Sequence, residues 1–216
     1  MKFSQIIILS AVLLTGCFKS EEQPVYSNVE GVVLLNGDGV SGANVHIRSN
    51  FDPGGFITEN FNENGISIEF NVQLEDLYTA SLYRYGTDEI LFTFFEDSLS
   101  VGVETIQISD SLLTNGLYFY QISRPSTAVA ADMFIVNKPD SLLPETVPLT
   151  STNGVGEFTL LNDYLALGRD FFTTAGGGFS ITDSLQIIIT NNEEILTIER
   201  VRVKPGQSNF FEITLD

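Results

Sequence analysis

The chain of 216 residues is poor in residues that often carry chemistry or hold secreted folds together: it has no tryptophan, one cysteine, Cys17, and one histidine, His46. A single cysteine cannot form an internal disulfide, so the folded part has to be held by its hydrophobic core. One imidazole leaves a Ser-His-Asp arrangement a single candidate base, and a zinc site would need carboxylates in place of the missing His and Cys ligands.

Basic residues are also few: 10 Lys and Arg stand against 28 Asp and Glu, which gives a net charge of −18. Nucleic-acid binding needs clustered Lys and Arg, so we expect no nucleic-acid partner. The same charge opposes adsorption to anionic lipid, so attachment to a membrane requires an anchor. Hydrophobic residues make up 43% of the chain and charged residues 18%, which is enough apolar material for a folded core.

The N-terminus contains a candidate anchor. The apolar run from Ile6 to Leu14 has the length of a signal-peptide h-region and is too short to span a membrane. The motif that follows, Leu14-Thr15-Gly16-Cys17, resembles the lipobox of bacterial lipoproteins. This resemblance implies cleavage between Gly16 and Cys17 and acyl chains, such as palmitate, on Cys17. The alternative is an ordinary secretory signal followed by a leftover thiol.

The five residues after Cys17 bear on the location of the protein. Phe18-Lys19-Ser20-Glu21-Glu22 resembles the lysine-plus-acidic signal that some diderm bacteria use to export lipoproteins to the outer face of the outer membrane. The alternative is a solvated acidic tether. We therefore expect an outer-membrane, lipid-anchored protein, on the periplasmic or the cell-surface face.

The rest of the chain has the pattern of strands. Ile66, Ile68, Phe70 and Val72 alternate with polar residues, which indicates a strand with one wet face. Further strands are expected at 29–35, 43–48, 78–84, 89–95, 103–108, 117–123, 133–136, 157–161, 185–190, 195–203 and 210–215. Only 162–167 has a helical pattern. The sequence therefore predicts an all-β fold, made of two Ig-like or transthyretin-like sandwiches.

The middle of the chain resembles a known family. The matching segments are Ile68-Glu69-Phe70, Ser81-Leu82-Tyr83, Gly86, Val101-Gly102-Val103, Asn115 to Ile122 and Phe134 to Lys138. In order and spacing they are similar to the Ig-like domain of flagellar hook-capping proteins and to the sorting domains of type IX secretion cargo. The resemblance covers about seventy residues and implies an Ig-like domain. Because 78 residues follow Lys138, we do not expect a terminal secretion tag.

The flanking segments resemble a different family. Val29 to Ile47 is similar to the first hairpin of carboxypeptidase-regulatory-like domains, which are transthyretin-like sandwiches, and Thr152 to Leu160 is similar to a later part of that pattern. We therefore expect one domain inserted into the other. The alternative is a tandem arrangement. The expected boundaries are 1–16 signal peptide, 17–27 acidic tether, 28–62 plus 149–216 regulatory-like sandwich, 63–138 inserted domain and 139–148 Pro-rich linker.

Few residues suggest catalysis or metal binding. His46 lies between Val45 and Ile47 in an alternating strand, which favours a strand-face residue that meets solvent or makes a structural hydrogen bond. Neighbouring acidic pairs in a strand point to opposite faces, so they do not form a glycosidase pair. Asn60 to Gly65 has part of a calcium-loop pattern without its leading aspartate, and Gly176 to Gly178 lacks the setting of a phosphate loop. We therefore expect no catalytic residues, metal or cofactor.

Aromatic residues suggest one further site. In the stretch Leu117 to Ile122, alternation places Tyr118 and Tyr120 on one face and Phe119 on the other. Such a two-sided apolar strand suits a domain junction or a sandwich edge, and we consider Tyr118 and Tyr120 as an interaction surface. The expected function is a non-enzymatic binding, adhesion or scaffolding module with a protein or glycan partner. The alternatives are a glycan-binding accessory lipoprotein of a polysaccharide uptake system and, with least support, a hydrolase.

Overall fold

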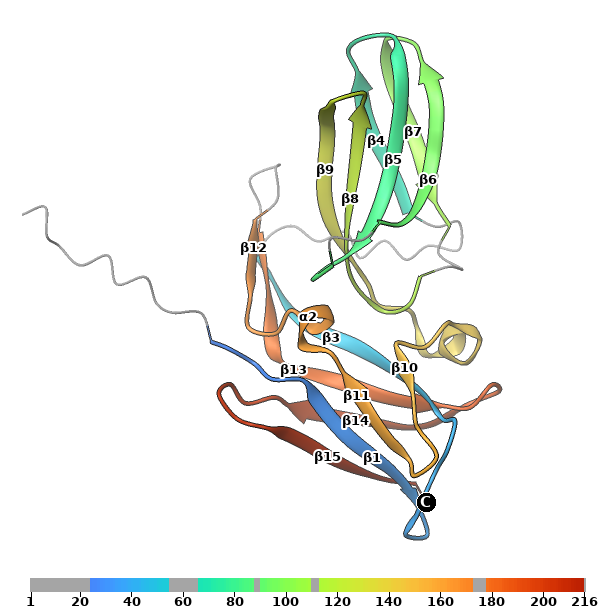
Figure 1. The fold of residues 1–216 in the computed structure, drawn as a ribbon, viewed down its shortest axis with the longest axis vertical. Helices are drawn as coiled ribbons and strands as arrows, with labels where there is room; N and C mark the ends of the chain where they lie inside the picture. Colours follow the sequence, from blue (N-terminus) through green and yellow to red (C-terminus); the bar gives the residue numbers. More distant parts are fainter. Residues whose placement is uncertain (1–23, 55–65, 88–89, 110–112, 173–177, 216) are drawn as a thin grey trace, which may run out of the picture.

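The computed structural model describes residues 24–54, 66–87, 90–109, 113–172 and 178–215. Within these ranges the elements are strands apart from one short α-helix, α2 (Asn162–Leu165), and one 3-10 helix, η2 (Asp140–Glu145). The prediction of an all-β fold is therefore confirmed. In Figure 1 the strands form two groups, which we call the lower unit (β1 to β3 and β10 to β15) and the upper unit (β4 to β9).

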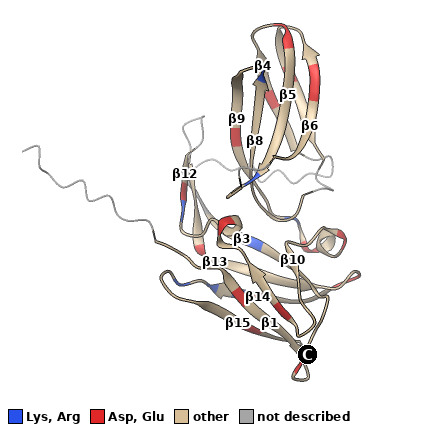
Figure 2. Cartoon of the chain, in the orientation of Figure 1, with Lys and Arg blue, Asp and Glu red and all other residues tan. Residues whose placement is uncertain are grey.

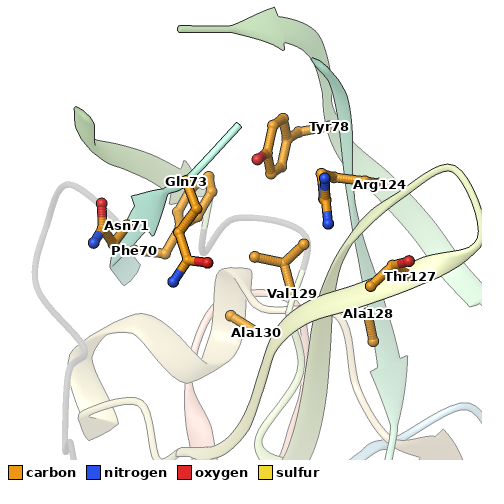
Figure 3. Close-up of a pocket in the computed structure, with 9 residues that line it drawn as sticks. All are labelled: Phe70, Asn71, Gln73, Tyr78, Arg124, Thr127, Ala128, Val129 and Ala130. Atoms are coloured by element: carbon orange, nitrogen blue, oxygen red, sulfur yellow. The ribbon is translucent and has the colours of Figure 1, made fainter. Parts of the chain in front are cut away.

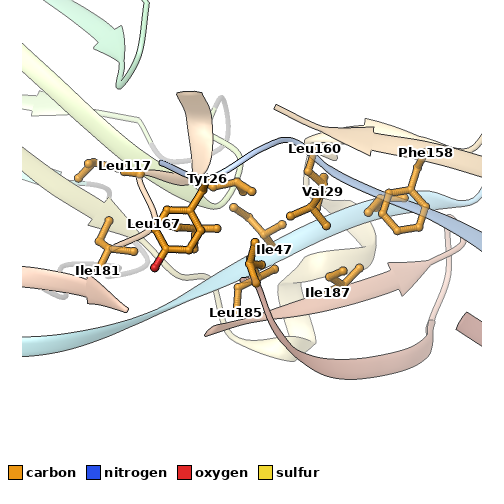
Figure 4. Close-up of a cluster of buried hydrophobic side chains, with 14 of the residues drawn as sticks. Tyr26, Val29, Ile47, Leu117, Phe158, Leu160, Leu167, Ile181, Leu185 and Ile187 are labelled. Atoms are coloured by element: carbon orange, nitrogen blue, oxygen red, sulfur yellow. The ribbon is translucent and has the colours of Figure 1, made fainter. Parts of the chain in front are cut away.

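The lower unit contains two sheets. In the first, β1 (Val29–Leu35) lies between β11 (Glu157–Leu160), its antiparallel neighbour, and β15 (Asn209–Leu215), its parallel neighbour, and it also pairs with β2 (Asp38–Gly39). In the second, β3 (Asn44–Gly54) lies between β10 (Thr150–Ser151) and β13 (Gly178–Thr190), and β13 also pairs with β12 (Asp170–Phe172) and β14 (Ile195–Arg202). Side chains from both sheets, such as Val29 and Ile187, share one buried cluster (Figure 4).

The upper unit also contains two sheets, of unequal width. The first has two strands, β4 (Ile66–Val72) and β7 (Gly102–Ile108). The second has four, in the order β6 (Ile90–Leu99), β5 (Asp76–Arg84), β8 (Gly116–Arg124) and β9 (Thr127–Val136). A second buried cluster contains alternate residues of β4, which follow a strict buried-exposed pattern, together with residues of β5, β7, β8 and β9. The narrow sheet therefore covers only part of the wide one.

The two units share apolar contacts at their junction. Leu117 and Ile135, which lie directly opposite each other in β8 and β9, belong to the buried cluster of the lower unit, and Figure 4 places Leu117 beside Leu167 and Ile181. Their sequence neighbours Tyr118 and Phe134 belong to the cluster of the upper unit. Since successive residues of a strand point to opposite faces, this strand pair contributes to both cores.

Polar and aromatic contacts strengthen the junction. The Tyr85 ring packs edge-on against Phe171, with ring centroids 5.2 Å apart, and its hydroxyl accepts a hydrogen bond from Arg169 Nη1 at 2.7 Å. Gly86 has φ of 81°, and a Cβ added there would lie 2.2 Å from the carbonyl oxygen of Asp163. A glycine is therefore required both by the backbone conformation and by the close approach of α2.

The segment 139–148, expected as a Pro-rich linker, contains the 3-10 helix η2 and is held against the lower unit. Arg48 on β3 donates from Nη2 to Asp140 Oδ1 at 2.6 Å and to the Lys138 carbonyl oxygen at 2.8 Å, and Asn137 donates to the Ser49 carbonyl oxygen at 3.2 Å. Leu143 is fully buried, and η2 contacts β14. Prolines prevented the segment from continuing a strand, but they allowed a tight 3-10 turn.

Candidate functional site

The upper unit is open along one side, between the free edges of its two sheets. β4 has β7 as its only strand partner among the described residues, and β9 lies at the end of the four-stranded sheet. Two pockets follow these two strands in series, and we call them together the β4–β9 groove. The distal pocket, of about 350 Å³, is lined by Phe70, Asn71, Gln73, Tyr78, Arg124 and 127–130 (Figure 3). The second pocket, of about 130 Å³, is lined by 66–69, Tyr120 and 132–134.

The groove follows from the difference in sheet width and from small side chains on β9. Two strands cannot cover four, so the inner face of β9 is left partly open near its start. Ala128 and Ala130 line the distal pocket and fill little of this space. Phe70 and Val129 form an apolar surface within it, so the pocket has an apolar base.

Polar side chains surround that apolar base. Arg124 is the last residue of β8, Thr127 the first of β9, and the two lie directly opposite each other in the hairpin register. Asn71 is on β4, and Gln73 is the first residue after the end of that strand. Figure 3 shows Gln73 and Arg124 on opposite sides of the pocket, with Val129 between them. A cation, amide groups and a hydroxyl around an apolar base suit a ligand with a carboxylate and a short apolar group.

Arg124 is available to a ligand. Within the described part of the chain, its guanidinium takes part in no ion pair and no side-chain hydrogen bond. By contrast, Arg84, at the junction end of the upper unit, lies over the Tyr164 ring at 5.1 Å from its centroid. Acidic residues prevail on the upper unit in Figure 2. An unpaired cation beside a pocket, in a chain with a net charge of −18, is therefore a candidate anion-binding group.

An apolar patch lies beside the distal pocket. The turns between β4 and β5, β6 and β7, and β8 and β9 gather at the top of Figure 1, which we call the distal end. Four apolar side chains there, Leu74, Leu77, Val101 and Val103, are between 41% and 69% exposed. The strand register places Val103 opposite Asn71, which lines the distal pocket, and Leu77 directly precedes Tyr78, which lines it too. Exposed apolar clusters of this kind often mark interaction surfaces.

A larger hollow, of about 700 Å³, lies beside the 139–148 segment and is lined in part by Arg48, Lys138 and Asp140. Its cation Arg48 is already paired with Asp140 and also donates to Gln186 Oε1 at 3.1 Å. Arg48 therefore serves to hold the segment in place, and the hollow is a weaker ligand site than the β4–β9 groove.

The structure separates the two tyrosines that were expected to form an interaction surface. Tyr118 is only 1% exposed, its hydroxyl donates to the Thr114 carbonyl oxygen at 2.9 Å, and its ring stacks on Phe134. Burial raises the pKa of Tyr118. Tyr120 is half-buried and lines the second pocket, and burial followed by the charge of Asp132 raises its pKa. Tyr118 is thus a core residue, and only Tyr120 reaches the groove.

His46 has a structural environment. It is buried, and its Nε2 lies 3.1 Å from Thr190 Oγ1 on the neighbouring strand β13. Its neighbours Val45 and Ile47 belong to the lower core, so His46 faces the opposite side of the sheet. Burial, and secondly the charge of Lys138, lowers the pKa of His46 to about 4. His46 is therefore neutral at pH 7, within a structural hydrogen bond of the kind that the sequence suggested.

Other candidates from the sequence cannot be placed. Gly16, Cys17, the run Asn60 to Gly65, and Gly176 lie outside the described residues. Within the described ranges there is no group of three or more His, Cys, Asp or Glu suited to a metal ion. Neither of the described helices is long and apolar enough to cross a membrane.

Sequence reasoning missed Arg124 as a candidate. A usable signal was present, because Ser-Arg-Pro at 123–125 ends the aromatic strand, and Arg124 is the only basic residue between Arg84 and Lys138.

In comparisons with known proteins, no family model, no curated protein and no solved structure matches this chain.

Proposed function

We propose that the chain is a non-enzymatic, lipid-anchored lipoprotein of the bacterial outer membrane, on its periplasmic or cell-surface face, that binds a partner protein at the distal end of its upper unit. The carrying observation is the unpaired Arg124 in a groove between two free strand edges. The adjacent apolar patch supports the proposal, since protein interfaces combine an apolar centre with polar groups around it. This makes the protein an adhesion or scaffolding module.

The proposed architecture is a carboxypeptidase-regulatory-like sandwich with an inserted hook-capping-like Ig domain. The support comes from strand pairing across the upper unit. Val32 on β1 lies opposite Glu157 of β11 and Glu212 of β15, and Val45 on β3 lies opposite Ile189 of β13. Strands that precede the upper unit in sequence thus pair with strands that follow it, as an insertion requires.

A protein partner is favoured over a glycan. Sugar-binding faces use exposed, coplanar aromatic rings. The most exposed aromatic residues among those described, Phe172 at 81% and Phe210 at 58%, lie on different sheets. Tyr83 and Phe119 are neighbours at 5.7 Å, but their rings are tilted by 50°. Free strand edges and apolar side chains are instead features that protein partners recognise.

The membrane anchor is tested by metabolic labelling. Cells that produce the wild-type chain should incorporate labelled palmitate into it, and cells that produce Cys17→Ala should not, because the thiol accepts an acyl chain. The release of the chain by detergent extraction provides a second measurement. Equal labelling of the two chains would show that the anchor is wrongly assigned.

The binding role is tested by photo-crosslinking in the cells that produce the protein. A photoreactive amino acid replaces Thr127 in the distal pocket or, as a matched control, Val155, which is exposed in a turn of the lower unit. We expect one discrete protein adduct from position 127 and none from position 155. Adducts that disappear after glycan removal would favour the polysaccharide alternative, and equal adducts from both positions would contradict a distal site.

A further inference from the structure

Resting on this proposed binding role, we propose that the partner enters the β4–β9 groove as an extended peptide segment that adds a strand to the free edge of β4. The segment carries a carboxylate, from an acidic side chain or a C-terminus, at the Arg124 end and a basic side chain four or five residues away, near Asp132. The occupant is thus an acidic-basic extended segment of another protein.

The edge of β4 is suited to strand addition. Its pairing with β7 runs from Ile66 to Val72 without a register shift, whereas the β8–β9 pairing shifts between Ile122 and Ser123. β4 contains no proline or lysine and one charged residue, Glu69, so it lacks most of the devices that protect edge strands. Among the described residues, no backbone hydrogen bond beyond the β4–β7 ladder involves 66–72. Its outward N–H and C=O groups are therefore free to pair with a peptide.

The two ends of the groove have opposite charge. Arg124 is at the distal end, opposite Thr127, and Asp132 lies opposite Tyr120, four residues earlier on β8. Asp132 and Glu69 both line the second pocket. At about 3.3 Å per residue, four or five residues of extended chain cover roughly 13 to 17 Å, which matches the separation of the two charged ends along the strand. The charges therefore define the spacing of the ligand's acid and base.

Two pockets of unequal size, each with apolar residues in its lining, lie between these ends. The distal pocket of about 350 Å³ has Phe70, Val129 and Ala130 in its lining, and the second pocket of about 130 Å³ has Ile68 and Phe134. Since alternate side chains of an added strand face the same side, two inward side chains of the peptide would enter the two pockets. We expect the larger apolar side chain next to the carboxylate and a small one next to the base.

A displayed library of random ten-residue peptides, selected on the purified full mature chain, tests the ligand chemistry. Enriched peptides should carry an acid and a base four or five positions apart. Arg124→Gln should weaken an enriched peptide by about tenfold or more in fluorescence anisotropy, because a charge-assisted hydrogen bond is lost. Arg200→Gln, which removes a cation from the lower unit, should change the affinity by less than about twofold. No enrichment, or equal effects of the two substitutions, would overturn the proposal.

Strand addition has its own test with the same peptide. Two versions of the peptide are made, with backbone nitrogens methylated at either the odd or the even positions. Methylation should abolish binding in the version whose modified N–H groups would face β4, and leave binding unchanged in the other version. Equal effects of methylation in the two peptides would exclude strand pairing. A doubled mass in light scattering that returns to the monomer value with Arg124→Gln would assign the groove to a second copy. If peptides fail but the crosslink from position 127 persists, the binding role stands and strand addition is rejected.

Discussion

At the scale of single residues, His46 is a buried titratable group whose pKa lies well below its ordinary value. It is buried on the face of the β3–β13 sheet that is turned away from the lower core, with Thr190 as its hydrogen-bond partner. Its Nδ1 has no partner among the described residues, so protonation there would add a buried charge without compensation. Lys138, two residues after the end of β9, adds a like charge to this environment. His46 therefore couples the stability of the fold to pH.

The pH dependence can be predicted with its sign. The pKa of His46 is about 4 in the folded chain and 6.5 as its ordinary value, so the unfolded chain binds the proton first as the pH falls. The contribution of neutral His46 is complete above about pH 6.5 and is lost as the pH falls through about 4. Between pH 7.5 and 4.5 the wild type should lose roughly 2 to 3 kcal/mol more unfolding free energy than His46→Gln. Urea titrations at the two pH values measure this, and equal losses would contradict it.

The two tyrosines of β8 provide a matched pair of substitutions. Tyr118→Phe removes the hydrogen bond to the Thr114 carbonyl oxygen in the core and should lower the free energy of unfolding by about 1 kcal/mol. Tyr120→Phe removes a hydroxyl beside the groove and should change stability by less than about 0.5 kcal/mol. Thermal unfolding of both variants compares the two positions. A larger loss of stability for Tyr120→Phe would contradict this, because it would show that the Tyr120 hydroxyl contributes more to the free energy of unfolding than the buried Tyr118 hydrogen bond.

At the scale of elements, strands with β-branched or strictly alternating residues could be predicted, and others could not. The segment 29–35 has the predicted bounds of β1, and the alternation from Ile66 to Val72 matches β4. β9 begins at Thr127, six residues before the predicted start, because its alanines have low strand propensity and conceal the pattern. The groove was missed for the same reason, since these alanines line it.

The sequence did not predict the role of the 3-10 helix η2, which packs against the lower unit. Leu143 is fully buried, whereas its neighbour Leu142 is exposed, so the two leucines form a matched pair. Leu143→Ala should reduce the free energy of unfolding by about 2 to 5 kcal/mol, as expected for a buried leucine. Leu142→Ala should reduce it by less than about 0.5 kcal/mol. Chemical denaturation distinguishes the variants, and equal small effects would show that the segment is a loose linker.

At the scale of the whole molecule, the strand pair β8–β9 connects the two units through side chains buried in the lower core, and we expect the units to unfold as one cooperative system. Leu117 and Ile135 are buried in the lower core, although their strands belong to an upper sheet. Such long-range contacts depend on tertiary packing, and the two-sided pattern of the sequence could only suggest that a junction was present. The apolar contact also explains why the units should unfold together.

Calorimetry tests this coupling. The wild type should unfold in one thermal transition, and the double variant Leu117→Ala/Ile135→Ala should unfold in two, because it loses the apolar contact between the units. Ile106→Ala serves as the control, since Ile106 is buried in the upper core alone, and it should lower the transition temperature without splitting the transition. Two transitions in the wild type would contradict the coupling.

The position of β1 and β3 within their sheets has a mechanical consequence. In a chain held at Cys17, tension between the membrane and a partner at the distal end passes along the chain through β1 and then β3. Each of these strands is flanked by neighbours on both sides, β11 and β15 for β1, and β10 and β13 for β3. Pulling either strand out requires two hydrogen-bonded ladders to break together, whereas β4 has one ladder among the described residues, so we expect β1 and β3 to resist tension longer than β4.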